Sequence, residues 1–113
     1  TNVQFSSSMA TVRITRIYSD DTGESHFDEV TTPLKDQGAI GFISEAIGAK
    51  NIFFRYTPGD YNFDFHNVPR RQFSINLDAS VKITVSDGKS QIFPPGSLLF
   101  AEDTSGKGHL SQV

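Results

Sequence analysis

The chain has 113 residues, a net charge of −3 from 10 Lys and Arg against 13 Asp and Glu, and no cysteine. This length suits one domain with one ordinary core, and the lack of cysteine excludes disulfides, thiolate metal sites and a cysteine nucleophile. The basic residues are scattered, and no apolar run approaches the roughly 20 residues that span a bilayer. We therefore expect no nucleic-acid or membrane partner and a cytoplasmic location.

The first residues, TNVQFSSS, precede Met9 and lack the apolar core of a signal peptide. We expect a tag or a disordered arm over residues 1–8, with Met9 as a natural start, and one folded domain over residues 9–113. A strand pattern begins just before Val113, so we also expect that the chain is a fragment.

The first half of the chain predicts strands separated by turns. Residues 11–18 alternate apolar and polar side chains, and residues 25–34 follow the turn sequence SDDTGES and close at Pro33. Residues 38–50 are ambiguous, because isoleucines at helical spacing stand among glycines; we favour strand or irregular structure over a short helix. Residues 51–57 are rich in aromatics and predict a strand that ends at the following Pro-Gly.

The second half continues in the same way. Residues 61–66 and 72–77 predict two short strands joined by a tight, charged turn, and residues 80–96 predict a hairpin about Asp87-Gly88. The segments SLLFAED and HLSQV, on either side of TSGKG, predict two more strands. Short strands at regular spacing are typical of an all-β sandwich or barrel in a single domain, with little or no helix.

Two sets of residues in this half have a characteristic spacing. The first set is Gly59, His66, Gln72 and Ala79. The second set is Gly88 and, after five residues, Pro94, Pro95 and Gly96. This spacing resembles the two motifs of the cupins, G-x5-H-x-H-x3,4-E-x6-G and G-x5-P-x-G-x2-H-x3-N. The resemblance covers residues 59–103 and implies a cupin-type double-stranded β-helix, a jelly-roll barrel.

Metal-binding cupins hold a divalent ion with three histidines and a carboxylate, and this chain departs from that pattern. The second His position is Val68, the His position of the second motif is Leu99, and its Asn position is Asp103. A neutral glutamine in place of the glutamate is also a weaker ligand. If Asp103 and His109 face each other across the TSGKG turn, His109 points into the barrel. The resemblance then implies a weak site for Fe, Ni, Zn or Mn formed by His66, Gln72 and His109; otherwise His109 is a surface residue.

The two strands that flank the charged turn each have an apolar and a polar face. The apolar set is Phe63, Phe65, Phe73, Ile75 and Leu77. The polar set is Asn62, Asp64, His66, Gln72, Ser74 and Asn76. Pattern rules alone favour the apolar set inside, whereas the resemblance to cupins places the polar set inside, and we favour the second arrangement. Each outward apolar side chain would forgo roughly 1.5–3 kcal/mol of burial, so we expect a homodimer through that face.

A polar barrel wall suits a small polar or anionic ligand. We expect His66 to be the catalytic residue, as metal ligand or general base. Further ligand contacts are expected from Asp64, Arg70, Arg71, Ser74 and Asn76. The two arginines either grip an anion or pair with nearby carboxylates. Two functions remain open. The resemblance implies lyase, isomerase or dioxygenase chemistry, whereas Val68 and Leu99 favour a metal-free, non-catalytic binding module.

Overall fold

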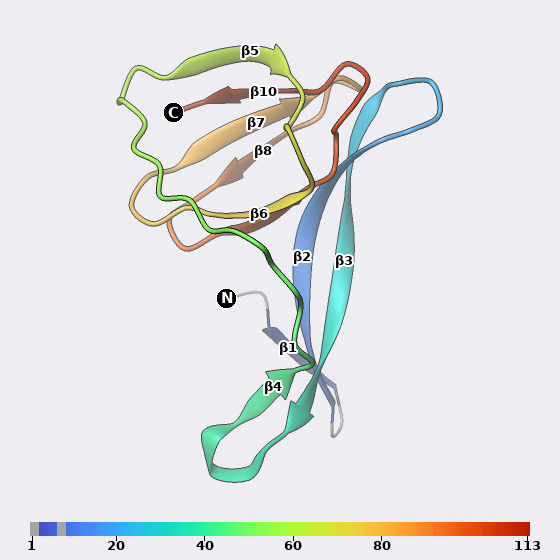
Figure 1. Cartoon of the computed structure of the whole chain (residues 1–113), viewed down its shortest axis with the longest axis vertical. Helices are drawn as coiled ribbons and strands as arrows, with labels where there is room; N and C mark the ends of the chain where they lie inside the picture. The colour runs from blue at the N-terminus through green and yellow to red at the C-terminus, as the bar shows by residue number, and fades with distance from the viewer. Residues whose placement is uncertain (1–2, 7–8) are drawn as a thin grey trace.

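The structure is a computed structural model that describes residues 3–6 and 9–113, without the side chains of residues 6 and 9. About half of the chain lies in β-strands, and the described residues contain no α-helix, only a 3₁₀ turn at Gly38–Ile40 (η1). The strands form two curled sheets (Figure 1). The prediction of an all-β protein with little or no helix is confirmed.

The larger sheet has six strands in the order β4-β3-β2-β9-β6, and β1 pairs with the first part of β2. Its strands are β1 (Val3–Ser6), β2 (Met9–Ser19), β3 (Ser25–Asp36), β4 (Phe42–Ser44), β6 (Gln72–Ile75) and β9 (Leu98–Ala101). The pairing of β2 with β9 is parallel and the other pairings are antiparallel. Strand β6 therefore lies at one end of this sheet.

The smaller sheet has four antiparallel strands in the order β5-β10-β7-β8. Its strands are β5 (Asn62–His66), β7 (Val81–Val85), β8 (Ser90–Phe93) and β10 (His109–Gln112). The predicted turn between β7 and β8 contains Gly88 with a φ of 98°, a left-handed conformation that glycine adopts without a steric penalty. The backbone N–H of Gly88 donates to the Val85 carbonyl and closes this turn.

The β2–β3 hairpin is the longest element, and its register runs from the pair Ala10 and Leu34 to the pair Ser19 and Ser25. Asp20 fixes the turn, because its Oδ1 accepts hydrogen bonds from the backbone N–H groups of Thr22 and Glu24. In Figure 1 the turn end of the hairpin lies beside the smaller sheet, whereas the other end projects away from it together with β1 and β4.

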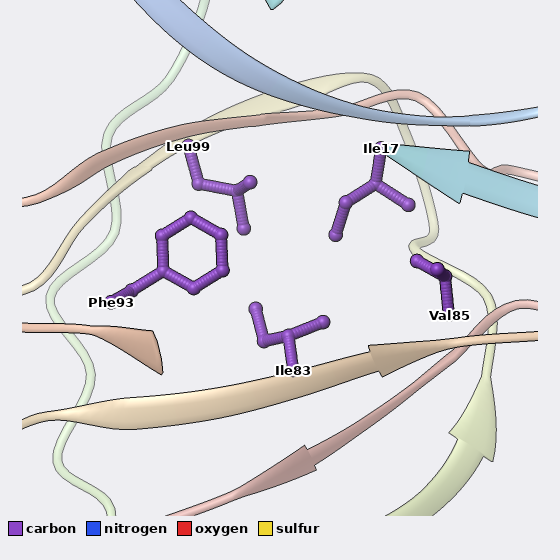
Figure 2. Packing of buried hydrophobic residues seen from close by; sticks show 5 residues of the cluster. All are labelled: Ile17, Ile83, Val85, Phe93 and Leu99. Carbon is purple, nitrogen blue, oxygen red and sulfur yellow. The ribbon is translucent and has the colours of Figure 1, made fainter. Parts of the chain in front are cut away.

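The hydrophobic core lies between the two sheets. Its buried members are Ile17, Ile83, Val85, Phe93 and Leu99, which point toward one another in Figure 2, and Phe27 and Val81 pack against them. They come from β2 and β9 on one side and from β7 and β8 on the other. Burial of each side chain of this size stabilises the folded state by roughly 1.5–3 kcal/mol. This small cluster is therefore the main apolar contact between the two sheets.

Several predicted elements differ from the structure. Pro33 lies inside β3, opposite Thr11, and does not end the strand. Strand β4 pairs only with residues 34–36, so at Pro33 the side of β3 that faces away from β2 has no neighbouring strand. The N–H that proline lacks would have no partner on that side, and no hydrogen bond of the sheet is lost. Residues 51–57 form no strand, although their sequence is typical of one. Among the described residues no strand lies beside them, and a strand needs a neighbour to accept and donate its backbone hydrogen bonds.

Two expected pairings are also wrong. Strands β5 and β6, expected to flank a tight turn, belong to different sheets, and so do β9 and β10. The connecting segments therefore cross from one sheet to the other.

Residues Val3–Ser6, where we expected a tag or a disordered arm, form β1 against β2. The rest of that expected arm, residues 1–2 and 7–8, lies outside the described residues. In the described part of the chain, no helix has the length and apolar character needed to cross a membrane.

Candidate functional site

Strand β6 has its polar side turned toward the interior. Gln72 and Ser74 are half-buried and pair with the buried Ala101 and Leu99 of β9, which face the core. The apolar side points outward, with Phe73 43%, Ile75 64% and Leu77 76% exposed. This arrangement of β6 confirms the interpretation that places the Gln72 side of the strand inside.

Strand β5 follows its predicted alternation only in part. His66 lies opposite His109 of β10, but Phe63 lies opposite Ser111, because a register shift interrupts the pairing between these two points. The bulge places Phe63 on the same face as His66, and the two rings stack with centroids 4.0 Å apart. The prediction that Phe63 points away from His66 is therefore wrong. Asp64, expected to face inward, is exposed.

His109 and Asp103 form a buried pair at the inner face of the smaller sheet. His109 is 5% exposed and lies opposite Val85, a residue of the core, so its ring points into the interior. Its Nδ1 lies 2.5 Å from Oδ2 of Asp103, which is fully buried. The condition for an inward-facing His109, its contact with Asp103, is met, although the two residues do not belong to one hairpin. The alternative that His109 is a surface residue is wrong.

The second oxygen of Asp103 has no hydrogen-bond partner. Oδ1 is the only buried side-chain oxygen or nitrogen without a partner among the described residues. A buried acceptor that lacks a donor costs about 1–3 kcal/mol. This cost favours a ligand that brings a donor group or a positive charge to Asp103.

His66 completes the cluster from the neighbouring strand. Its ring centroid lies 4.6 Å from that of His109, and its Nδ1 donates to the backbone carbonyl of Asp64 at 2.8 Å. Both imidazoles thus have Nδ1 engaged by an oxygen acceptor, and among the described residues neither Nε2 has a hydrogen-bond partner. An oxygen acceptor on one ring nitrogen is the usual arrangement when the other nitrogen binds a metal or a proton.

The backbone around the cluster holds these side chains in place. Asn67 donates from Nδ2 to the carbonyls of Asp103 and Gly106, and Val68 donates its backbone N–H to the Asp103 carbonyl. Gly108 has a φ of 73°, and a Cβ there would overlap the carbonyl of His66. These contacts bring the segment after β5 against the segment before β10, although the two are distant in sequence.

The residues present fit a divalent metal in part. The two imidazoles have the hydrogen bonding of metal ligands, and imidazole suits zinc, iron and nickel. Gln72 faces the interior from the other sheet, where its pairing partner Ala101 is two residues from Asp103. Within the described part of the chain, no three His, Cys, Asp or Glu side chains are grouped as a metal site. Val68 and Leu99, which the expected resemblance to cupins aligns with two ligand positions, are 6% and 8% exposed.

The residues expected to contact substrate lie at different places. Arg71 is exposed and its Nε donates to Oε2 of Glu102 at 2.6 Å, whereas Arg70 lies over the ring of Phe53. Asn76 donates from Nδ2 to the carbonyl of Phe93 and so fixes the turn before β9. Ser74 is half-buried on the inner face of β6. Of this set only Ser74 and Asn76 lie on the interior side.

Sequence reasoning missed the stacking of Phe63 on His66, because nothing in the local pattern indicates the bulge in β5.

The fold and the cluster together define an all-β protein of two facing sheets with a buried histidine–aspartate pair. Comparison of the chain with models of protein families, with curated proteins and with solved structures gives no match. The functional argument therefore depends on the cluster itself.

Proposed function

We propose that this protein is a cupin-type barrel that binds a small polar or anionic metabolite at the cluster of His66, His109 and Asp103. The observation that carries the proposal is the pair of imidazoles on one inner face, each with Nδ1 engaged by an oxygen and each with Nε2 available. Two available imidazole nitrogens beside a buried carboxylate can bind a cation, hold a proton or accept a hydrogen bond from a ligand hydroxyl.

A divalent ion at this cluster would be held by His66 and His109, with the Gln72 oxygen as the third candidate ligand. The ion would act as a Lewis acid toward a carbonyl or carboxylate of the ligand. Asp103 orients the His109 ring through Nδ1, so that Nε2 keeps one direction. The unpartnered Oδ1 of Asp103 supports the same proposal, because a bound cation or donor group would compensate it.

In an enzyme form of this proposal in which His66 is not a metal ligand, His66 is the general base. It is less buried than His109, and its Nδ1–H is already bonded to a backbone carbonyl, so that Nε2 carries the lone pair. The lyase, isomerase and dioxygenase reactions that the cupin resemblance implies share this need for a positioned base or metal.

A metal-free binding module is the second candidate, and one observation favours it. Leu99 belongs to the hydrophobic core and Val68 is buried, so two of the positions that hold ligands in metal-binding cupins are apolar and enclosed here. In this case the cluster binds its ligand by hydrogen bonds alone, with Asp103 and the histidines as the polar groups.

Titration with Zn²⁺ or Ni²⁺, followed by calorimetry, separates the two candidates. We expect one ion per chain in the wild type and a loss of affinity of about tenfold or more in His66→Ala and in His109→Ala. His26→Gln is the matched control, because His26 is the remaining histidine and both its ring nitrogens are bonded to carboxylates elsewhere. If no variant differs from the wild type, or if the wild type binds no ion at any loading, the metal site is refuted and the binding module remains.

A further inference from the structure

Residues 51–57 lie in the connection between β4 and β5 and contain no helix, turn or bend (Figure 1). Within the described part of the chain, none of their backbone N–H and C=O groups forms a hydrogen bond with another segment. Their sequence, NIFFRYT, is nevertheless typical of a strand, because aromatic and β-branched side chains are enriched in strands. This segment therefore has the side chains of a strand and a backbone that is open to another strand.

One row of side chains along the segment is almost fully exposed. Ile52 is 81%, Phe54 is 87% and Tyr56 is 90% exposed. In a strand conformation, residues two apart in sequence share a face, so these three side chains form one apolar row. Single exposed apolar residues are normal on a protein surface, whereas a contiguous row indicates an interaction site.

The residues that alternate with this apolar row are associated with positive charge. Arg70 lies over the ring of Phe53, with its guanidinium carbon 5.5 Å from the ring centroid. Arg55 lies over the ring of Tyr61, at 5.2 Å. Among the ion pairs of the described residues, none includes either of these two arginines. The aromatic rings therefore hold both guanidinium groups beside the segment, where their charge is available to a partner.

The sequence around the segment adds no negative charge. Residues 46–57 contain Lys50 and Arg55 but no Asp or Glu, in a chain whose net charge is −3. The next acidic residue along the chain, Asp60, follows the Pro-Gly pair that ends the segment. This surface is thus positive on a chain that is negative as a whole, and it complements an acidic partner.

We propose that residues 51–57 bind an acidic, extended segment of another protein by β-strand pairing. The backbone groups of the two segments bond to each other, as in other complexes formed by strand addition. Side chains that are opposite each other across two paired strands share a face. The partner's apolar side chains then lie beside the apolar row, and its carboxylates lie beside the two arginines. The partner therefore alternates apolar and acidic residues.

The open backbone favours a peptide partner over a lipid surface, because hydrocarbon offers no hydrogen-bond partner to N–H and C=O groups. The composition agrees, since aromatic residues and arginine are enriched in protein interfaces and dominate their binding energy. The proposal goes beyond the proposed function, because it needs no ligand or metal at the cluster of His66, His109 and Asp103.

Fluorescence anisotropy with a labelled Val-Glu-Val-Glu-Val-Glu-Val peptide tests this proposal on the whole chain without added metal. We expect the wild type to bind this peptide, and to bind the matching peptide with lysine in place of glutamate at least about tenfold more weakly. Arg55→Glu should weaken binding of the first peptide about tenfold or more. Lys82→Glu is the matched control, because it makes the same change of charge at an exposed position on β7 and should bind like the wild type.

Hydrogen exchange tests the strand pairing itself. We expect the backbone amides of residues 52–56 to exchange rapidly in the chain alone and to become protected when the acidic peptide is bound. Phe54→Ser removes an exposed side chain of the apolar row, so it should fold normally and lose both the binding and the protection.

Several results would overturn the proposal. It is refuted if the wild type binds both peptides equally or binds neither, or if Arg55→Glu binds like the wild type. Protection of the same amides in the chain alone would show that the backbone is already paired. Binding to phosphatidylserine vesicles that the acidic peptide does not displace assigns the segment to a lipid surface instead. A dimer in light scattering that Phe54→Ser dissociates assigns it to a second copy of the chain.

Discussion

The Asp103–His109 pair is unusual at the scale of single residues, because a fully buried carboxylate has only one of its two oxygens bonded. Buried polar groups in folded proteins are normally satisfied, and the exceptions are often at functional sites. The position of Asp103 follows from local structure: it lies two residues beyond Ala101, the last residue of β9, and its side chain is fully buried.

Replacement of Asp103 tests both roles of this residue. Asp103→Ala removes the acceptor for His109 and leaves a buried ring nitrogen without a partner, so we expect a loss of about 1–3 kcal/mol in the free energy of unfolding. Because the ring also loses its orientation, we expect Zn²⁺ affinity to fall about 10–100-fold. Urea titration and calorimetry measure the two effects.

Two further variants make this result specific. Asp103→Asn keeps an oxygen acceptor and should lose less Zn²⁺ affinity than Asp103→Ala. Asp78→Ala removes an exposed carboxylate and should change the free energy of unfolding by less than about 0.5 kcal/mol. Equal Zn²⁺ affinity in Asp103→Ala and the wild type would show that Asp103 does not position the ring.

At the scale of elements, the contact between the end of β5 and the start of β10 decides the geometry of the site. His66 and His109 are opposite each other in the register, and Gly108 lies against the His66 carbonyl. Only glycine suits this position, because φ is 73° and a Cβ would meet backbone atoms that cannot rotate away. The close approach of two backbones therefore holds the two imidazoles together.

Gly108→Ala should accordingly separate β5 from β10. We expect a loss of at least about 1–3 kcal/mol in the free energy of unfolding, together with loss of Zn²⁺ binding. Gly48→Ala is the control, because a Cβ at Gly48 meets nothing within 4 Å and its φ is not in the left-handed region. Thermal melting of both variants checks the prediction, and a stable Gly108→Ala variant that still binds Zn²⁺ would contradict it.

At the scale of the whole molecule, polar contacts join the two sheets at the turn end of the β2–β3 hairpin; we call Ser25, Ser86, His26, Asp20 and Asp87 the polar clamp. Ser25 is fully buried; its Oγ donates to the Gly108 carbonyl, and Ser25 and Ser86 exchange backbone-to-hydroxyl bonds. Beside it, His26 places Nε2 2.6 Å from Asp20 and Nδ1 2.7 Å from Asp87. The clamp thus connects the β2–β3 turn with the β7–β8 turn.

The clamp makes stability depend on pH. Hydrogen bonds to Asp20 and then to Asp87 raise the pKa of His26 above its ordinary value of 6.5. A raised pKa in the folded state means that the stabilisation is complete below about pH 6.5 and is lost as pH rises through the folded pKa. The pKa values of both partner carboxylates are lowered in turn. For Asp20 the cause is hydrogen bonds donated by Thr22 and then by His26. For Asp87 it is hydrogen bonds donated by the Lys89 backbone and then by His26. Their contribution is therefore present above about pH 4 and is lost on acidification.

We therefore expect the melting temperature to fall as pH rises from 6 to 9, in the wild type. In His26→Gln this fall should be smaller, because the glutamine side chain does not titrate. Melting curves at fixed ionic strength across this range measure the difference. Identical slopes in the two proteins would exclude His26 as the origin of the pH dependence.

The chain alone determined which segments prefer to be extended, where most turns lie and which side of β6 is polar. These properties are local: alternation has a period of two residues, and Asp-Gly or Pro-Pro-Gly sequences bend the chain wherever they occur. His66 was recognised as a candidate site residue from its place in the spacing that resembles the cupin motifs, and His109 from its possible contact with Asp103.

The β7–β8 hairpin was predicted from its turn, but only the tertiary structure decided which strands distant in the chain pair. Residues 51–57 have a strand sequence but no partner among the described residues, and β5 and β6 are neighbours in sequence yet belong to different sheets. The bulge in β5, which places Phe63 on His66, also depends on its pairing with β10. Strand pairing depends on hydrogen bonds and burial between segments distant in the chain, and a local pattern holds no information about which distant segment satisfies them.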